Sequence, residues 1–164
     1  MESLEAHSVP LGGIRLVEAS AGTGKTFTLT TLYLRIVMEQ DYEADQILVV
    51  TFTKAAAAEL RERIRARLRE MEAALALRLS GEGFESRGEL SVIDRLAEAS
   101  VERGQPEVDL ERLRRVLRNF DEAQISTIHG FCSRILREFV KAKTGDNKNR
   151  SVDTWSLSGL DLSK

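Results

Sequence analysis

Hydrophobic residues along the chain alternate between helical spacing and short continuous runs, as in proteins that pack helices around a parallel sheet. Helical spacing first occurs in residues 27–37. Short apolar runs, which predict strands, occur near 14–18, 47–52 and 124–128. The pattern therefore predicts an α/β fold, a parallel sheet flanked by helices. The apolar positions of the first helix are Leu29, Leu32, Tyr33, Ile36 and Val37.

Three further helices are predicted between the second and third strands. A long helix begins near Ala55, carries one apolar stripe and ends at the glycines of residues 80–83. A second helix covers about 89–102, and a third begins near Asp109, its expected N-cap. We expect residues 80–120 to form a helical insertion. The stripe of the long helix comprises Leu60, Ile64, Leu68, Met71, Leu75 and Leu79.

The long helix also carries a row of like charges, formed by Arg61, Arg65 and Arg69. Arginines at i, i+4 spacing disfavour a helix unless an anion or a carboxylate compensates them. Glu59 lies four residues before Arg63. We expect Glu59 and Glu62 to form an ordinary solvated ion-pair face with Arg63 and Arg65.

After the third strand, residues 129–130 are expected to form a turn into a last helix. Cys132, Ile135, Leu136 and Phe139 would share one face of that helix. From residue 141 the chain becomes polar and rich in Gly and Asn, a composition typical of disordered or weakly packed segments. We therefore expect residues 1–140 to hold the folded part and residues 141–164 to form a polar tail.

A glycine-bearing stretch, residues 18–26, lies between the first strand and the first helix. Gly22 and Gly24 can adopt the φ values that let backbone N–H groups surround a polyphosphate. The helix start at Lys25 adds N–H groups and a positive dipole end. Lys25 can then reach the phosphates, and the Thr26 hydroxyl can ligate Mg²⁺. The stretch predicts a phosphate-binding P-loop.

The usual P-loop signature begins with glycine, where this chain has Ala19. Alanine is the smallest replacement and is tolerated if its φ is negative. The alternative is a plain strand-to-helix turn with a solvated Lys25.

Composition narrows the classes of partner. The net charge of −2 predicts no bulk attraction to DNA, so any nucleic-acid contact must be local. The single cysteine, Cys132, excludes an internal disulfide and suits a reducing compartment. No apolar run approaches a membrane span, and no basic-plus-apolar leader starts the chain. We expect a cytoplasmic protein without a membrane partner.

Three stretches, residues 17–28, 49–61 and 126–132, occur in the order of known helicase motifs. They resemble motifs I, Ia and Ib of the UvrD/Rep superfamily of DNA helicases, and within it the RecB type, the beta subunit of exodeoxyribonuclease V. The resemblance covers about residues 10–140. It implies a partial RecA-like P-loop domain that belongs to the N-terminal, ATP-binding part of a UvrD-like helicase.

The resemblance implies two groups of site residues. Residues that would bind ATP are Ala19, Ser20, Ala21, Gly22, Thr23, Gly24, Lys25 and Thr26, with Thr26 on Mg²⁺. Residues that would line the path of a DNA single strand are Thr51, Phe52, Thr53, Thr127, His129 and Phe131. Hydroxyls suit phosphate contacts, and aromatic rings offer sequence-tolerant stacking.

Each aromatic or histidine assignment has a structural alternative. Phe52 fits a core position at a strand end equally well. His129 fits a turn histidine, and Phe27 is read as a buried helix residue rather than an adenine contact. The family often places Gln in the turn before the first strand, where it reads the adenine, and Gly12 stands there in this chain.

Parts that a translocating helicase needs do not follow Phe131. The missing parts are an acidic Mg²⁺/water site, arginine fingers, a second motor domain and a nuclease domain. We expect the N-terminal part of an ATP-dependent DNA helicase/exonuclease subunit of double-strand break repair and recombination, unable alone to hydrolyse ATP or unwind DNA. Its parent would bind a single strand at a duplex end and join the gamma- and alpha-type subunits of an exodeoxyribonuclease V-like complex.

Two other functions remain open. The chain could be a non-catalytic subunit-interaction module that docks through the helical insertion and carries a vestigial P-loop. It could also be a small P-loop kinase or another ATPase, which would share only the first motif.

Overall fold

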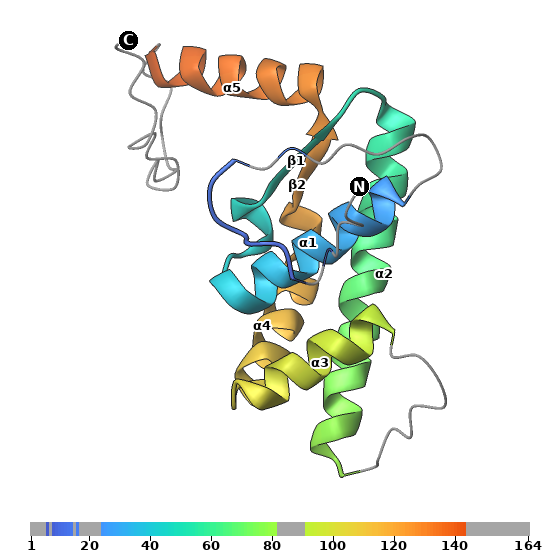
Figure 1. Cartoon of the computed structure of the whole chain (residues 1–164). Helices are drawn as coiled ribbons and strands as arrows, with labels where there is room; N and C mark the ends of the chain where they lie inside the picture. The colour runs from blue at the N-terminus through green and yellow to red at the C-terminus, as the bar shows by residue number, and fades with distance from the viewer. Residues whose placement is uncertain (1–5, 7, 15, 17–23, 82–90, 144–164) are drawn as a thin grey trace. The chain divides into compact units, whose positions relative to one another are not determined.

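The computed structural model describes residues 6, 8–14, 16, 24–81 and 91–143. The chain divides into two units, Met1–Thr127 and Ile128–Lys164, and each is described by itself. Among the described residues, the first unit holds four α-helices and a pair of strands, and the second holds one α-helix; Figure 1 labels these elements. The predicted polar tail lies outside the described residues from residue 144 onward, and the division of the chain at residue 140 stays a prediction.

The described elements follow the order α1 (Lys25–Gln40), η1 (Ala44–Gln46), β1 (Leu48–Thr51), α2 (Lys54–Leu79), α3 (Val92–Glu102), α4 (Pro106–Arg118), η2 (Phe120–Glu122), β2 (Gln124–Thr127) and α5 (Ile128–Lys143). β1 and β2 pair in parallel, from Leu48 opposite Gln124 to Thr51 opposite Thr127. This helix-rich fold with a parallel strand pair agrees with the predicted α/β class and with two of the three predicted strands. None of the described helices has the length and apolar content needed to cross a bilayer.

The remaining strand, predicted at residues 14–18, is absent at the two positions of it that the structure describes. Ile14 and Leu16 lie outside any strand and are 96% and 83% exposed. An apolar run becomes a stable strand when neighbouring strands satisfy its backbone groups. Within the described residues β1 and β2 pair only with each other, so no ladder forms at Ile14 or Leu16. Residues 15, 17 and 18 lie outside the description.

Two helix starts differ from the prediction. α4 begins at Pro106 rather than near Asp109. Proline suits the first helical position because its φ is already helical and its missing N–H is not needed there. Asp109 is therefore not an N-cap: its carboxylate is buried and accepts hydrogen bonds from Ser100 at 2.6 Å and Arg103 at 2.9 Å. α5 begins at Ile128, so residues 129–130 lie inside its first turn instead of forming a turn before it.

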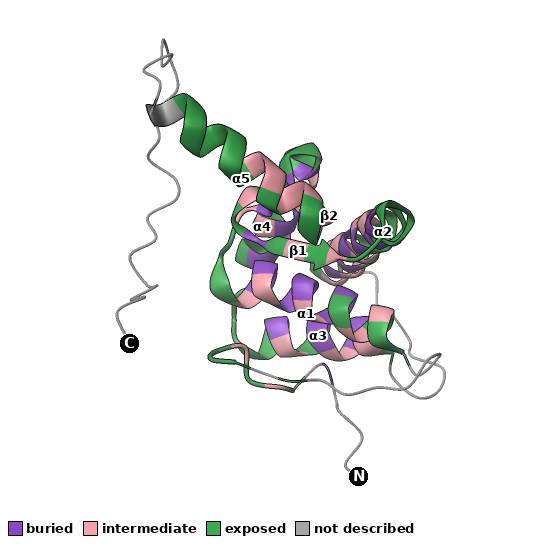
Figure 2. Ribbon diagram, turned by 90° about the horizontal axis from the view of Figure 1, so that it is seen from above, coloured by how far each residue is buried: buried purple, intermediate pink, exposed green. Residues whose placement is uncertain are grey.

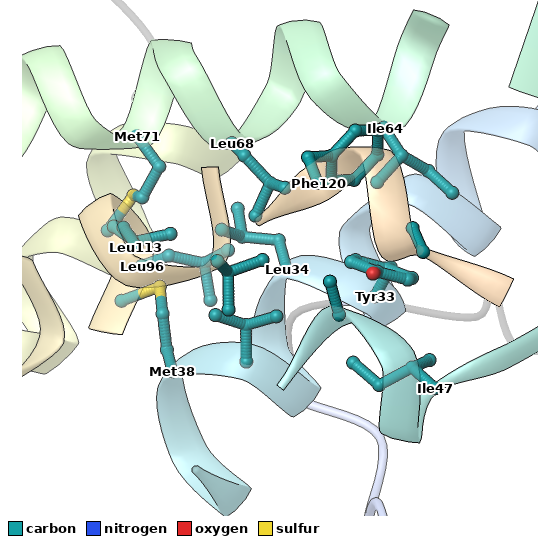
Figure 3. Close-up of a cluster of buried hydrophobic side chains, with 14 of the residues drawn as sticks. Tyr33, Leu34, Met38, Ile47, Ile64, Leu68, Met71, Leu96, Leu113 and Phe120 are labelled. Carbon is teal, nitrogen blue, oxygen red and sulfur yellow. The ribbon is translucent and has the colours of Figure 1, made fainter. Parts of the chain in front are cut away.

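The hydrophobic core of the first unit lies between α1, α2, α3, α4 and η2 (Figure 3). The predicted stripe of α2 supplies one wall of the core, and Figure 2 shows that its buried side faces α1 while the opposite side is exposed. The α2 residues Leu60, Ile64, Leu68, Met71 and Leu75 are all at most 5% exposed. Large side chains that face them include Leu34, Met38, Leu113, Val116 and Phe120.

Candidate functional site

The start of α1 has the features of an anion site. Gly24 precedes the helix at φ +84°, a left-handed conformation that disfavours other residues, and no atom would meet an added Cβ. The first intrahelical bond runs from the Thr28 N–H to the Gly24 carbonyl at 2.9 Å. The N–H groups of Lys25, Thr26 and Phe27 therefore have no intrahelical acceptor, and the first turn contains no acidic residue. A phosphate group fits this end of the helix.

Lys25 supplies a cation at the same helix end. Its side chain is exposed and makes no ion pair with any other described residue. Thr26, beside it, is half-buried. The other predicted loop residues, Ala19, Ser20, Ala21, Gly22 and Thr23, lie outside the described residues. In the described part of the chain, no group of three or more His, Cys, Asp or Glu side chains could hold a metal ion.

A pocket of about 220 Å³ adjoins Thr26 between α1 and α2. On its wall, the Arg67 guanidinium lies 4.9 Å from the ring centroid of Phe27 and pairs with Glu70 at 3.0 Å. Guanidinium and aromatic faces together form a flat, polarisable surface. The lining residues are Thr26, Phe27, Thr30, Arg63, Ala66, Arg67 and Glu70.

Phe27 is 41% exposed, so the prediction of a buried helix residue at this position is wrong. The buried residues of α1 begin at Thr30, one turn into the helix. The first turn extends beyond the core, and Phe27 therefore lies at the pocket instead of in the interior. Its neighbour Arg67 comes from α2 and was not found from the sequence, because no spacing rule relates the two helices.

The C-terminal end of β1 carries three of the residues predicted to contact DNA. Phe52 is 91% exposed, so its reading as a core residue is wrong. Thr53 is the N-cap of α2, and its side-chain oxygen accepts the Ala56 N–H at 3.1 Å. The Thr51 hydroxyl donates to the Thr53 carbonyl at 3.0 Å, which fixes the turn between β1 and α2.

Thr127 lies at the same edge of the sheet as these residues. Parallel strands end on the same side, and the register places Thr127 opposite Thr51. His129 and Phe131 lie in the first turn of α5, which continues directly from β2. His129 is exposed, and the Arg134 guanidinium lies 5.6 Å from the ring centroid of the half-buried Phe131. The role of these six residues in DNA binding stays a prediction.

Comparison with known proteins adds a family to this geometry. The model of the UvrD/REP helicase N-terminal domain matches residues 2–158. RecBCD enzyme subunit RecB of Escherichia coli (strain K12) is 41% identical over 143 residues, which cover 82% of this chain and 11% of the relative. RecBCD enzyme subunit RecB of Mycobacterium tuberculosis (strain CDC 1551 / Oshkosh) is 43% identical over 136 residues, 83% of this chain and 11% of the relative.

A third relative matches almost the whole chain. RecBCD enzyme subunit RecB of Buchnera aphidicola subsp. Schizaphis graminum (strain Sg) is 38% identical over an alignment of 180 residues. That alignment covers 99% of this chain and 14% of the relative. The chain thus spans about a ninth to a seventh of the length of these relatives. Since the family model covers most of the sequence, the chain belongs to the UvrD/REP helicase N-terminal domain family.

Proposed function

We propose that the chain is the ATP-binding N-terminal portion of a RecB-type ATP-dependent DNA helicase/exonuclease subunit that acts in double-strand break repair and recombination. The observation that carries the proposal is the start of α1. There Gly24 is left-handed and Lys25 supplies a cation. The first N–H groups of the helix, from Lys25 onward, have no intrahelical acceptor. The family match and the RecB relatives support the wider assignment.

In this proposal the polyphosphate of Mg·ATP lies at the start of α1. Lys25 would reach the β- and γ-phosphates and the Thr26 hydroxyl would ligate Mg²⁺, while residues 19–23 are assigned to the phosphate loop from the sequence pattern alone. The pocket next to Thr26 would receive the nucleoside, with the Phe27 ring and the Arg67 guanidinium as its stacking surface. A P-loop NTPase fold is part of this proposal.

The DNA single strand would lie along the edge at which β1 and β2 end. Thr53 and Thr127 would supply hydroxyls suited to phosphates, and the exposed Phe52 ring would supply a stacking surface. Thr51 would position them, because its hydroxyl donates to the Thr53 carbonyl. The resemblance also implies His129 and Phe131 as DNA contacts, and these two residues belong to the second unit. In the longer parent this path would hold the single strand at a duplex end, and the parent would assemble with gamma- and alpha-type subunits of an exodeoxyribonuclease V-like complex.

We propose further that this chain binds ATP without hydrolysing it. Hydrolysis needs a residue that orients the attacking water. Glu70 is the acidic residue of the pocket, and its carboxylate is already paired with Arg67 at 3.0 Å.

The test is a titration of the purified chain with a fluorescent ATP analogue and Mg²⁺, together with an assay of phosphate release. We expect binding that unlabelled ATP competes, and phosphate release at the background level. Lys25→Ala should abolish binding. Lys54→Ala is the matched control, because Lys54 is likewise exposed and is the first residue of its helix, α2. Wild type that does not bind would contradict the proposal, and turnover that Lys25→Ala abolishes would contradict its limitation to binding.

A further inference from the structure

The arginine row of α2 consists of Arg61, Arg65 and Arg69. The charge of Arg61 is compensated by backbone carbonyls of the segment that leads into β2. The Arg61 guanidinium donates hydrogen bonds to the carbonyl oxygens of Phe120, Ala123 and Ile125, at 3.4, 2.8 and 3.3 Å. Arg61 is half-buried, so water competes weakly for these carbonyls. A single side chain of α2 therefore holds the chain from η2 to the second residue of β2.

The next arginine of the row reinforces this attachment. Arg65 pairs with Asp121 at 2.5 Å, and its guanidinium lies 5.0 Å from the ring centroid of the buried Phe120. Arg69, a further turn along, is exposed and makes no hydrogen bond or ion pair with another described residue. The expected solvated face is confirmed for Glu59 and Arg63, which pair at 2.6 Å. The row is therefore divided into two anchoring arginines and one solvated arginine.

The strand pair alone fixes its register weakly. β1 and β2 have 4 residues each, and within the described residues they pair only with each other. Moving β2 by one residue would turn the buried Ile125 to the opposite face and displace Thr127 from its place opposite Thr51. Because α2 starts directly after β1, a bond from Arg61 to the Ile125 carbonyl ties β2 to the frame of β1.

We propose that Arg61 is a positioning residue that holds β2 in register with β1 and so places Thr127 beside Thr51. The importance of that placement for single-strand binding rests on the proposed function. Arg61 itself contacts no ligand in this proposal. It acts through the carbonyls of the segment that leads into β2.

The test measures the register by disulfide formation in the full chain with the exposed Cys132 replaced by serine. Leu48→Cys and Gln124→Cys form the reporter pair, because these residues are opposite each other in the native register. Glu72→Cys and Arg114→Cys form a second pair, which a short bis-maleimide bridges because the native side chains that pair there at 3.2 Å are long; this pair reports the packing of α2 on α4. Each pair is examined with Arg61 intact and with Arg61→Met, Arg61→Lys or Arg69→Met.

We expect Arg61→Met to slow disulfide formation in the 48/124 pair roughly tenfold, the effect of losing about one charge-assisted hydrogen bond. The 72/114 pair should be unaffected. Arg61→Lys should restore the rate in part, since an ammonium group can reach some of the carbonyls but lacks the planar fork. Arg69→Met, which removes the same charge from the same helix, should change neither pair.

An unchanged rate in the 48/124 pair of Arg61→Met would overturn the proposal, as would failure of that pair to form with Arg61 intact. If neither cysteine pair forms its cross-link in Arg61→Met, that variant has unfolded, and Arg61→Lys is compared instead. Equal effects of Arg61→Lys on the two pairs would then overturn the proposal. Neither ATP nor DNA enters the assay, so a failure here is distinct from a failure of the proposed function.

Discussion

Aromatic residues are buried in the helical part of the first unit and exposed at the candidate site. We call the start of α1 and the C-terminal ends of β1 and β2 the site edge. In the helical part, Phe120 and Leu113 are 1% and 0% exposed. At the site edge, Phe27 and Phe52 are 41% and 91% exposed. The helices α1 to α4 bury most of their large apolar side chains in a common core, whereas Phe27 and Phe52 are left in solvent. Exposed aromatic rings are typical of a surface that a ligand or partner covers.

Charged residues show the same contrast. In the helical part, several arginines are paired with acids from other helices or turns, as in Arg78 with Asp94 at 3.1 Å and Arg103 with Asp109 at 2.9 Å. At the site edge, Lys25 makes no ion pair with another described residue. Stability and ligand binding should therefore depend on different residues, and mutations can separate the two.

The largest expected effect is the loss of a core ring. Phe120→Ala should lower the free energy of unfolding by about 3–5 kcal/mol, because the buried ring leaves a cavity and the Tyr33 ring loses its edge-to-face partner, at 6.4 Å. Phe52→Ala removes the same side chain from the site edge and should change stability by less than about 0.5 kcal/mol. Urea unfolding followed by circular dichroism measures both. Similar losses in the two variants would contradict the contrast.

A buried acid should come next. Asp109 is fully buried and pairs with both Arg103 and Arg112. Asp109→Ala should cost about 3 kcal/mol, since it leaves cationic side chains without their buried partner. The exposed pair of Asp121 with Arg65 is the control, and Asp121→Ala should cost less than about 1 kcal/mol. Equal costs in urea unfolding would mean that burial does not distinguish the two pairs.

Two left-handed glycines sharpen the comparison further. Gly24 lies at the site at φ +84° and Gly104 between α3 and α4 at φ +67°, and neither has an atom near an added Cβ. Alanine at either position should cost about 1–2 kcal/mol through backbone strain alone. Calorimetric titration with Mg·ATP should show weaker binding for Gly24→Ala and wild-type affinity for Gly104→Ala. Equal affinities in the two variants would argue against a phosphate site at Gly24.

A smaller effect is expected on the pH dependence of stability, through Asp94. Burial raises the pKa of Asp94, but hydrogen bonds from Ser91 and Arg78 outweigh it and hold that pKa below its usual range. A pKa that is lower in the folded protein gives stability above the unfolded value, near 4, and this stability is lost as the pH falls through the folded pKa. Asp94→Asn should therefore lower stability at pH 7 and reduce the further loss of stability as the pH falls below about 4. An unchanged pH profile of urea unfolding would contradict this.

Periodicity predicted the parts of the fold that depend on neighbours in sequence. The stripe of α2 and the strand from Leu48 to Thr51 follow from spacing and β-branched residues. Which faces are covered depends on distant elements. A continuous apolar run such as 47–50 is typical of a strand that is covered on both faces, yet Val50 is 43% exposed. Asp109 looked like a helix cap, but Pro106 starts the helix three residues earlier.

The candidate site divides in the same way. Gly24, Lys25 and Thr26 could be found from the sequence, because their chemistry depends on consecutive residues. The contact of Phe27 with Arg67 depends on how α1 packs on α2, so it cannot be predicted from the local sequence. The three carbonyl contacts of Arg61 likewise link positions far apart in sequence. Only the folded structure shows which arginines of the row hold the segment that leads into β2.

We propose that the start of α1 binds the phosphates of Mg·ATP while the helical part supplies the stability. Thermal unfolding of the chain with increasing Mg·ATP, beside Lys25→Ala, tests this claim. A ligand that binds only the folded state raises the melting temperature by mass action. We predict equal melting temperatures for the two proteins without nucleotide, and a rise with Mg·ATP in the wild type that Lys25→Ala abolishes. No rise in the wild type, or the same rise in Lys25→Ala, would contradict the claim.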